Sequence, residues 1–250
     1  MLYLDSANNV KSAPDRTVKI AFYDLERDPA KVVTTVDGAF VWTIEGERGM
    51  YVLDVDLSEA GTWGAEFTTQ APGSAAETVR LTFPVRSDVP TIRVGQPAPK
   101  SKTPTAADVG GDLSRISTDQ APAPAFYGTS VADALAAHKP FMLVFATPKF
   151  CTSAQCGPTL DHLKPIAAAH PDITFINVEP YKLQFANGAL NAVLDANNQL
   201  QATEVTDQWG LLSEPWIFAV DRAGIVRGSY EVTITPAEID AILPVITAGG

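Results

Sequence analysis

The chain has 250 residues, of which 46% are hydrophobic and 19% charged. Its 18 Lys and Arg residues against 29 Asp and Glu residues give a formal net charge of −11, which argues against nucleic acid or an anionic membrane as a partner. The longest apolar runs, Phe141–Ala146 and Trp216–Val220, are strand-sized and far short of the ~18 residues of a membrane span.

The first residues, MLYLDSANNV, lack the basic and apolar segments of a signal peptide. We expect membrane association only through an anchor upstream of this chain, and a location outside the cytoplasm, in a periplasm or at a cell surface. A cytoplasmic protein would begin in the same way, so this alternative stays open.

Residues 1–92 predict an all-β module, because short alternating segments follow one another at a spacing of roughly 8–12 residues. In Thr17–Tyr23 the side chains of Val18, Ile20 and Phe22 fall on one face. The other expected strands are Ala39–Glu45, Gly49–Leu57, Gly61–Thr68 and Thr78–Pro84. This pattern resembles the immunoglobulin-like sandwich, which implies a docking or structural module. It has neither cysteine nor histidine.

Residues 93–124 are rich in Pro, Gly, Ser and Thr, a composition typical of a semi-stiff linker. A competing interpretation is that part of this segment packs on the following module, since VGQPAPK resembles the lead-in of redoxin domains.

Residues 125–250 predict an α/β module. The expected order is helix, buried strand, helix, strand, helix, hairpin and helix, with Tyr181–Leu200 left unassigned. The ranges are Ser130–His138, Phe141–Ala146, Pro158–His170, Ile173–Val178, Ala202–Trp209, Trp216–Val220 paired with Ile225–Tyr230, and a last helix that starts in a capping box at Thr235–Glu238.

The two cysteines, Cys151 and Cys156, follow the buried strand. Cys156-Gly157-Pro158 matches the start of a CGPC motif, and Ser213-Glu214-Pro215-Trp216 precedes the expected hairpin. In order and motifs, residues 125–250 resemble the thioredoxin-like superfamily, with a C-x4-C spacing in place of C-x-x-C. The resemblance implies thiol–disulfide exchange with a protein partner, and a cis-proline at Pro215.

We expect Cys156 to attack as a thiolate, because Pro158 is tolerated only in a first helical turn and the helix N-terminus stabilises a thiolate. Cys151 would then resolve the mixed disulfide. Pro215, Glu214 and Trp216 would form the groove that binds the substrate chain.

The acid usually found beneath a thioredoxin active site is missing from Phe141–Ala146, so another group, such as Asp161 or His162, would accept the proton. The alternative for both is an ordinary place on the helix surface, and the pattern favours it. We expect no cofactor and no bound metal.

Other functions stay open. In a non-catalytic extracytoplasmic interaction protein, Cys151 and Cys156 would form a structural disulfide. A copper-handling protein of the Sco type would need a histidine from the C-terminal segment, but all three histidines precede residue 171. A peroxiredoxin would use Ser153, three residues before Cys156, although the rest of that motif is broken.

Overall fold

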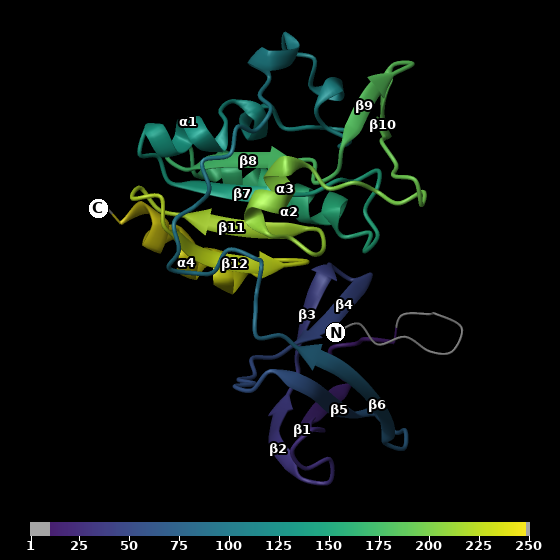
Figure 1. The fold of residues 1–250 in the computed structure, drawn as a ribbon. Coiled ribbons are helices and arrows are strands. Elements are labelled where there is room, and N and C mark those ends of the chain that lie inside the picture. The colour runs from purple at the N-terminus through teal and green to yellow at the C-terminus, as the bar shows by residue number, and fades with distance from the viewer. Residues whose placement is uncertain (1–10, 249–250) are drawn as a thin grey trace. The chain divides into compact units, whose positions relative to one another are not determined.

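The computed structural model describes residues 11–248, which are rich in β-strand and contain few helices (Figure 1). The chain divides into two compact units, Met1–Val89 and Pro90–Gly250. Each unit has its own hydrophobic core.

The described part of the first unit consists of β-strands. One sheet has the order β2-β1-β5-β6, and a β3–β4 hairpin forms a second sheet. The strands are β1 (Thr17–Asp24), β2 (Val32–Asp37), β3 (Ala39–Ile44), β4 (Arg48–Val52), β5 (Gly61–Gln70) and β6 (Glu77–Val85).

The core of the first unit follows the predicted alternation of β1. Val18, Ile20 and Phe22 are buried, and they share one cluster with Trp63 of β5 and Tyr51 of β4. Two expectations were wrong. The strand β2 was not anticipated, because its residues are exposed or half-buried and show no apolar face. The strand expected over Gly49–Leu57 ends at Val52.

The second unit is built on a sheet with the order β12-β11-β7-β8, in which β7 and β8 are parallel and the other pairs are antiparallel. A separate β9–β10 hairpin occupies part of the unassigned Tyr181–Leu200 segment. The strands are β7 (Phe141–Phe145), β8 (Thr174–Val178), β9 (Leu183–Ala186), β10 (Ala189–Ala192), β11 (Trp216–Val220) and β12 (Val226–Glu231).

The α-helices of the second unit cover both faces of this sheet. They are α1 (Val131–Ala136), α2 (Cys156–Ala169), α3 (Glu204–Trp209) and α4 (Pro236–Thr247). Residues of α2 and α4 share a core with Met142 and Val144, whereas residues of α1 and α3 pack with Leu143 and Phe145. All five residues of β7 are therefore fully buried, which confirms the prediction of a strand with no polar face.

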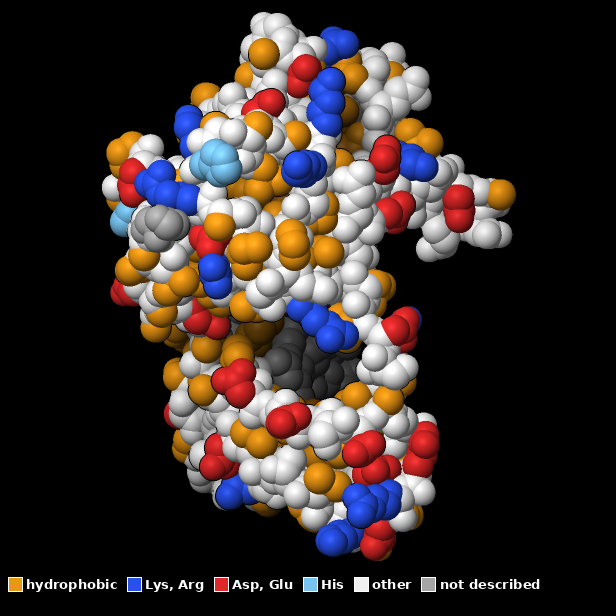
Figure 2. Space-filling model, turned by 60° about the vertical axis from the view of Figure 1, so that its left-hand side comes forward, with side chains coloured by type: hydrophobic (Ala, Val, Ile, Leu, Met, Phe, Trp, Pro, Cys, Tyr) orange, Lys and Arg blue, Asp and Glu red, His pale blue; other side chains and the backbone are white. Residues whose placement is uncertain are grey.

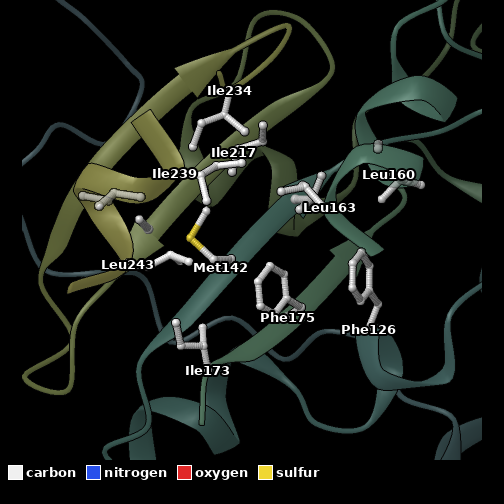
Figure 3. Packing of buried hydrophobic residues seen from close by; sticks show 14 of the residues in the cluster. Phe126, Met142, Leu160, Leu163, Ile173, Phe175, Ile217, Ile234, Ile239 and Leu243 are labelled. Atoms are coloured by element: carbon white, nitrogen blue, oxygen red, sulfur yellow. The ribbon is translucent and has the colours of Figure 1, made fainter. Parts of the chain in front are cut away.

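The core on the α2–α4 face is drawn in Figure 3. Met142 of β7 points toward Leu243 and Ile239 of α4, and Phe126 lies beside Phe175 of β8. The rings of Phe126 and Phe175 are stacked with their centroids 5.6 Å apart. Phe126 belongs to η3 (Pro124–Tyr127), so the chain ahead of α1 completes this core.

Residues 93–124 are not a free linker. They contain two further 3₁₀ turns, η1 (Ala107–Val109) and η2 (Leu113–Arg115), and several of their side chains are buried. Ser101 Oγ accepts a hydrogen bond from Trp209 Nε1 at 3.1 Å, and Thr103 Oγ1 accepts one from the backbone N–H of Val131, also at 3.1 Å. The interpretation that this segment packs on the following module is the one that the structure supports.

The helix starts follow local sequence rules. The capping box at Thr235 and Glu238 is present, with Pro236 in the first turn. Ser130 caps α1 by accepting a hydrogen bond from the N–H of Asp133. Helix α2 begins at Cys156, as the position of Pro158 predicts.

Acidic and basic side chains are interspersed with apolar ones on the face shown in Figure 2. No helix within residues 11–248 is both long and apolar enough to cross a membrane.

Candidate functional site

Three segments of the second unit meet at one edge of its sheet. Phe145, the last residue of β7, lies opposite Val178 at the end of β8 and opposite Trp216 at the start of β11. The loop after β7, the chain after β8 and the chain before β11 are therefore neighbours. In open α/β sheets, ligands bind outside the carboxyl ends of the parallel strands. This edge carries both cysteines.

Cys151 and Cys156 form a disulfide, with their Cα atoms 6.0 Å apart. Cys156 is the first residue of α2 and is fully buried, whereas Cys151 lies in the preceding loop and is half-buried. The backbone N–H of Cys156 donates a hydrogen bond to Cys151 Sγ at 3.2 Å. Ser153 Oγ lies 3.3 Å from the same sulfur. The helix N-terminus thus points a donor at the more accessible sulfur.

A set of four residues, Thr152, Ser153, Tyr181 and Glu214, holds the disulfide loop in place, and we call it the loop clamp. The backbone N–H and the hydroxyl of Thr152 both donate to Glu214 Oε1 at 2.9 Å. The Tyr181 hydroxyl donates to Glu214 Oε2, and Ser153 Oγ donates to the Glu214 carbonyl oxygen at 3.1 Å. Both the side chain and the backbone of Glu214 are therefore engaged by neighbouring segments.

The acceptor of the clamp is buried, whereas Thr152 is exposed. Glu214 is only 5% exposed. Burial, followed by the hydrogen bond to Glu214, raises the pKa of Tyr181 well above its ordinary value. The phenol therefore stays protonated and remains a donor to the Glu214 carboxylate.

The expected substrate contacts lie beside the disulfide loop. Glu214 stays a predicted substrate contact, and its carboxylate accepts hydrogen bonds from the disulfide loop. Pro215 follows it through a cis peptide bond and is buried. Trp216 is half-buried, and its Nε1 donates to Ser229 Oγ at 2.9 Å. Its ring stacks on Phe218 at a centroid distance of 6.1 Å.

A buried carboxyl group lies at the end of β8, where the sequence analysis did not look. Glu179 is 9% exposed, and its Oε1 accepts hydrogen bonds from the backbone N–H of Thr118 at 2.6 Å and from the Thr118 hydroxyl at 2.8 Å. Burial raises the pKa of Glu179. The signal that could have found it is its position, directly after the apolar Ile173–Val178 segment.

Polar side chains continue from Glu179 into the core. Asn177 Nδ2 donates to the Tyr127 hydroxyl at 2.9 Å, which donates in turn to Ser117 Oγ at 2.8 Å. Burial raises the pKa of Tyr127 to about 12. Asn177, Tyr127 and Ser117 therefore form a buried chain of hydrogen bonds that starts two residues before Glu179.

Asp161 and His162 do not contact the cysteines. Asp161 is exposed and pairs with Lys164 at 2.7 Å. His162 is half-buried, its pKa is lowered by burial, and its Nε2 has no hydrogen-bond partner among the described residues. Neither side chain hydrogen-bonds to Cys151 or Cys156 within residues 11–248, so the alternative proton acceptors lack support.

In the described part of the chain, no group of three or more His, Cys, Asp or Glu side chains is arranged to hold a metal ion. No protein family, curated protein or solved structure matches this chain in comparisons with each. The functional argument therefore rests on the residues and on their geometry.

Proposed function

We propose that the second unit is a thioredoxin-like domain that exchanges thiols and disulfides with a protein partner, and that the first unit is an immunoglobulin-like sandwich that docks it. The element order supports the first assignment. A parallel β7–α2–β8 unit is followed by the β11–β12 hairpin and by α4, in a sheet covered on both faces. The resemblance of residues 125–250 to the thioredoxin-like superfamily rests on the same order of elements.

The observation that carries this proposal is the environment of the cysteine pair. Cys151 is half-buried in a loop, Cys156 is buried at the first residue of a helix, and the N–H of Cys156 points at the sulfur of Cys151. N–H groups and the positive end of the helix dipole stabilise a thiolate. Reducing the disulfide therefore leaves Cys151 with a donor already in place.

Burial favours the reverse of the roles expected from the sequence, with Cys151 as the sulfur that exchanges first. An incoming thiolate reaches Cys151 Sγ and not the fully buried Cys156. Attack forms a mixed disulfide between the substrate sulfur and Cys151, and Cys156 leaves as a thiolate. The second thiolate of the substrate then attacks the substrate sulfur that is bonded to Cys151, and Cys151 is released as a thiolate. The substrate dithiol is oxidised to a disulfide, the cysteine pair is reduced, and the substrate's two protons pass to the medium or to the new thiolates.

The partner and the location follow from this chemistry. A protein dithiol or disulfide is the substrate, and no cofactor is required, because the cysteines themselves carry the electrons. The disulfide suits an oxidising compartment outside the cytoplasm. The net charge of −11 disfavours nucleic acid as a partner.

One observation favours a second candidate, a non-catalytic interaction protein with a structural disulfide. The loop clamp holds the Cys151 loop with three hydrogen bonds that Thr152 and Ser153 donate to the carboxylate and the carbonyl oxygen of Glu214. A loop that is fixed in this way resists the movement that a mixed disulfide requires.

Trapping of mixed disulfides tests the proposal. In Cys156→Ser, the Cys151 thiolate can attack a disulfide peptide, and the resulting mixed disulfide has no resolving thiol in the protein, so it should accumulate and be visible in non-reducing gels and intact mass. Cys151→Ser should trap far less, because its remaining thiol is buried. Equal trapping by both variants would refute the assigned roles, and no trapping by either would favour the structural disulfide.

A further inference from the structure

A pocket of about 380 Å³ opens beside the loop clamp in the second unit. Tyr181 lies in its wall, together with Glu179 at the end of β8. Apolar side chains form much of the remaining wall, among them Val178, Leu183 and Leu190. Pockets of this size, mostly apolar with a few polar groups, are typical of sites for small molecules.

The charged residues of the wall are mainly basic. Lys102, Arg115 and Lys182 all line the pocket, and none forms an ion pair with a carboxylate among residues 11–248. The Arg115 guanidinium lies over the ring of Phe185 at 4.5 Å from its centroid. In a chain with a net charge of −11, three cations on one pocket wall mark a local excess of positive charge, and one of them, Lys102, has the acidic neighbour Asp108.

The wall carries two acidic residues against these three cations. Glu204 lies at the start of α3, is exposed as the three cations are, and accepts a hydrogen bond from Gln208 Nε2 at 3.3 Å. Glu179 is buried, its Oε1 is engaged by Thr118, and burial favours its neutral form. The pocket therefore presents cations next to apolar surface, a combination that suits an organic anion better than a cation or a neutral polar molecule.

We propose that this pocket binds a small organic carboxylate with an apolar body, and that its occupant contacts Tyr181 and thereby acts on the disulfide loop. The carboxylate would pair with Arg115 and Lys182, and the apolar body would pack on Val178 and Leu190. Binding stands independently of the proposed redox function, whereas the effect on the loop concerns the same cysteine pair.

The connection to the disulfide passes through side chains in direct contact. Tyr181 lines the pocket and donates its hydroxyl proton to Glu214 Oε2. The other carboxylate oxygen of Glu214 holds Thr152, which is the residue after Cys151. A ligand that fixes or shifts the Tyr181 ring changes the support of the loop. By thermodynamic linkage, the ligand then has different affinities for the oxidised and reduced protein.

Binding is tested with three probes that share one apolar body: 3-phenylpropionate, 3-phenylpropanol and 3-phenylpropylamine. Each is titrated into the full oxidised chain by calorimetry. The carboxylate should bind most tightly, and Arg115→Gln and Lys182→Gln should each weaken it about tenfold while leaving the alcohol unchanged. Lys139→Gln, an exposed lysine outside the pocket, is the matched control. Equal binding of the three probes, absence of carboxylate binding, or unchanged affinity in both pocket variants would overturn the site.

The effect on the loop is tested in glutathione buffers, by measuring the ratio of oxidised to reduced protein with and without saturating 3-phenylpropionate. The wild-type ratio should change about fivefold or more, and Tyr181→Phe should still bind the probe but lose this change. An unchanged wild-type ratio at saturation would refute the link to the loop. The redox proposal is tested separately, by the reduction potential of the cysteine pair and by the trapping of mixed disulfides, both measured without 3-phenylpropionate.

Discussion

Glu214 shows how a single carboxylate can organise a loop. Its side chain accepts from Thr152 and Tyr181, and its carbonyl oxygen accepts from Ser153. Hydrogen bonds to a charged group are stronger than those between neutral groups, and buried donors left without an acceptor are costly. The fixed position of Cys151 is therefore a property of the chain before β11 as much as of its own loop.

Replacement of this carboxylate should loosen the loop. We expect Glu214→Ala to lower the free energy of unfolding by roughly 1–3 kcal/mol, because it leaves Thr152 and Tyr181 without their acceptor. Urea unfolding of the oxidised protein measures the change. Asp240→Ala, which removes an exposed carboxylate from α4, serves as the control and should change stability little. Equal effects of the two substitutions would contradict the clamp.

Glu179 predicts a pH dependence with a definite sign. Burial raises its folded-state pKa above its ordinary value of 4.5, so the folded state binds the proton more tightly than the unfolded state does. This contribution to stability is fully present below pH 4.5 and is lost as the pH rises through the folded-state pKa. Through this group, the free energy of unfolding changes by at most about 1.4 kcal/mol per pH unit.

The matched variant is Glu179→Gln, which keeps the acceptor for Thr118 and cannot ionise. The free energy of unfolding of the wild type relative to this variant should fall as the pH rises above 4.5. Urea unfolding between pH 4 and 8 measures it, with Glu204→Gln as the exposed control. A difference that stays constant or rises with pH would show that burial does not disfavour the charged form of Glu179.

Among the elements, the short helix α3 depends on its C-terminal glycine. Gly210 caps the helix with a φ of 65°, and a Cβ there would overlap the Pro90 carbonyl oxygen. Thr91 Oγ1 donates to the Gly210 carbonyl oxygen at 2.8 Å, so the start of the second unit packs against this position. Both the left-handed conformation and the close approach require glycine.

A pair of glycine substitutions separates these two requirements. Gly188 also has a positive φ, 77°, but a Cβ there meets nothing within 4 Å. Gly188→Ala should cost about 1–2 kcal/mol from conformation alone. Gly210→Ala should cost clearly more, because Pro90 must also move. Thermal and urea unfolding of both variants test this, and equal losses would mean that the Pro90 contact contributes nothing.

Elements whose signal is local could be predicted from the sequence. The fully apolar Phe141–Phe145 strand, the start of α2 two residues before Pro158 and the capping box of Thr235 and Glu238 depend on neighbours in the chain. Strand β2 escaped prediction because neither of its faces is buried, so no alternation marks it.

The candidate site could be predicted only in part. Cys151, Cys156 and the Glu214-Pro215 segment were found through their motif. Tyr181 and Glu179 were missed because the chain after β8 lies beside the segment that follows β7 only when β8 pairs with β7, and no spacing in the sequence encodes that proximity. The order of the two cysteines along the chain also does not reveal which sulfur is buried.

For the whole molecule, the boundary between the units matters for folding. The second unit begins at Pro90, and residues 93–124 contribute buried side chains and hydrogen bonds to its core. The sequence places the start of the α/β module at residue 125. A fragment that begins there would lack Ser101 and Thr103, which accept hydrogen bonds from Trp209 and from Val131 of α1.

Two fragments test this boundary. We expect residues 90–250 to unfold cooperatively in urea with the disulfide intact, whereas residues 125–250 should show little cooperative transition and should bind a hydrophobic dye. Circular dichroism and dye fluorescence on both fragments measure the outcome. Cooperative unfolding of the shorter fragment would show that residues 93–124 are a linker that the fold of the second unit does not need.

The reduction potential of the Cys151–Cys156 pair tests the central proposal most directly. The full chain is equilibrated in glutathione buffers of known ratio, quenched with acid, alkylated and analysed by intact mass. The proposed exchange function predicts a potential between about −120 and −270 mV, the range of working oxidoreductases. A potential below about −300 mV would contradict it and would identify the bond as structural.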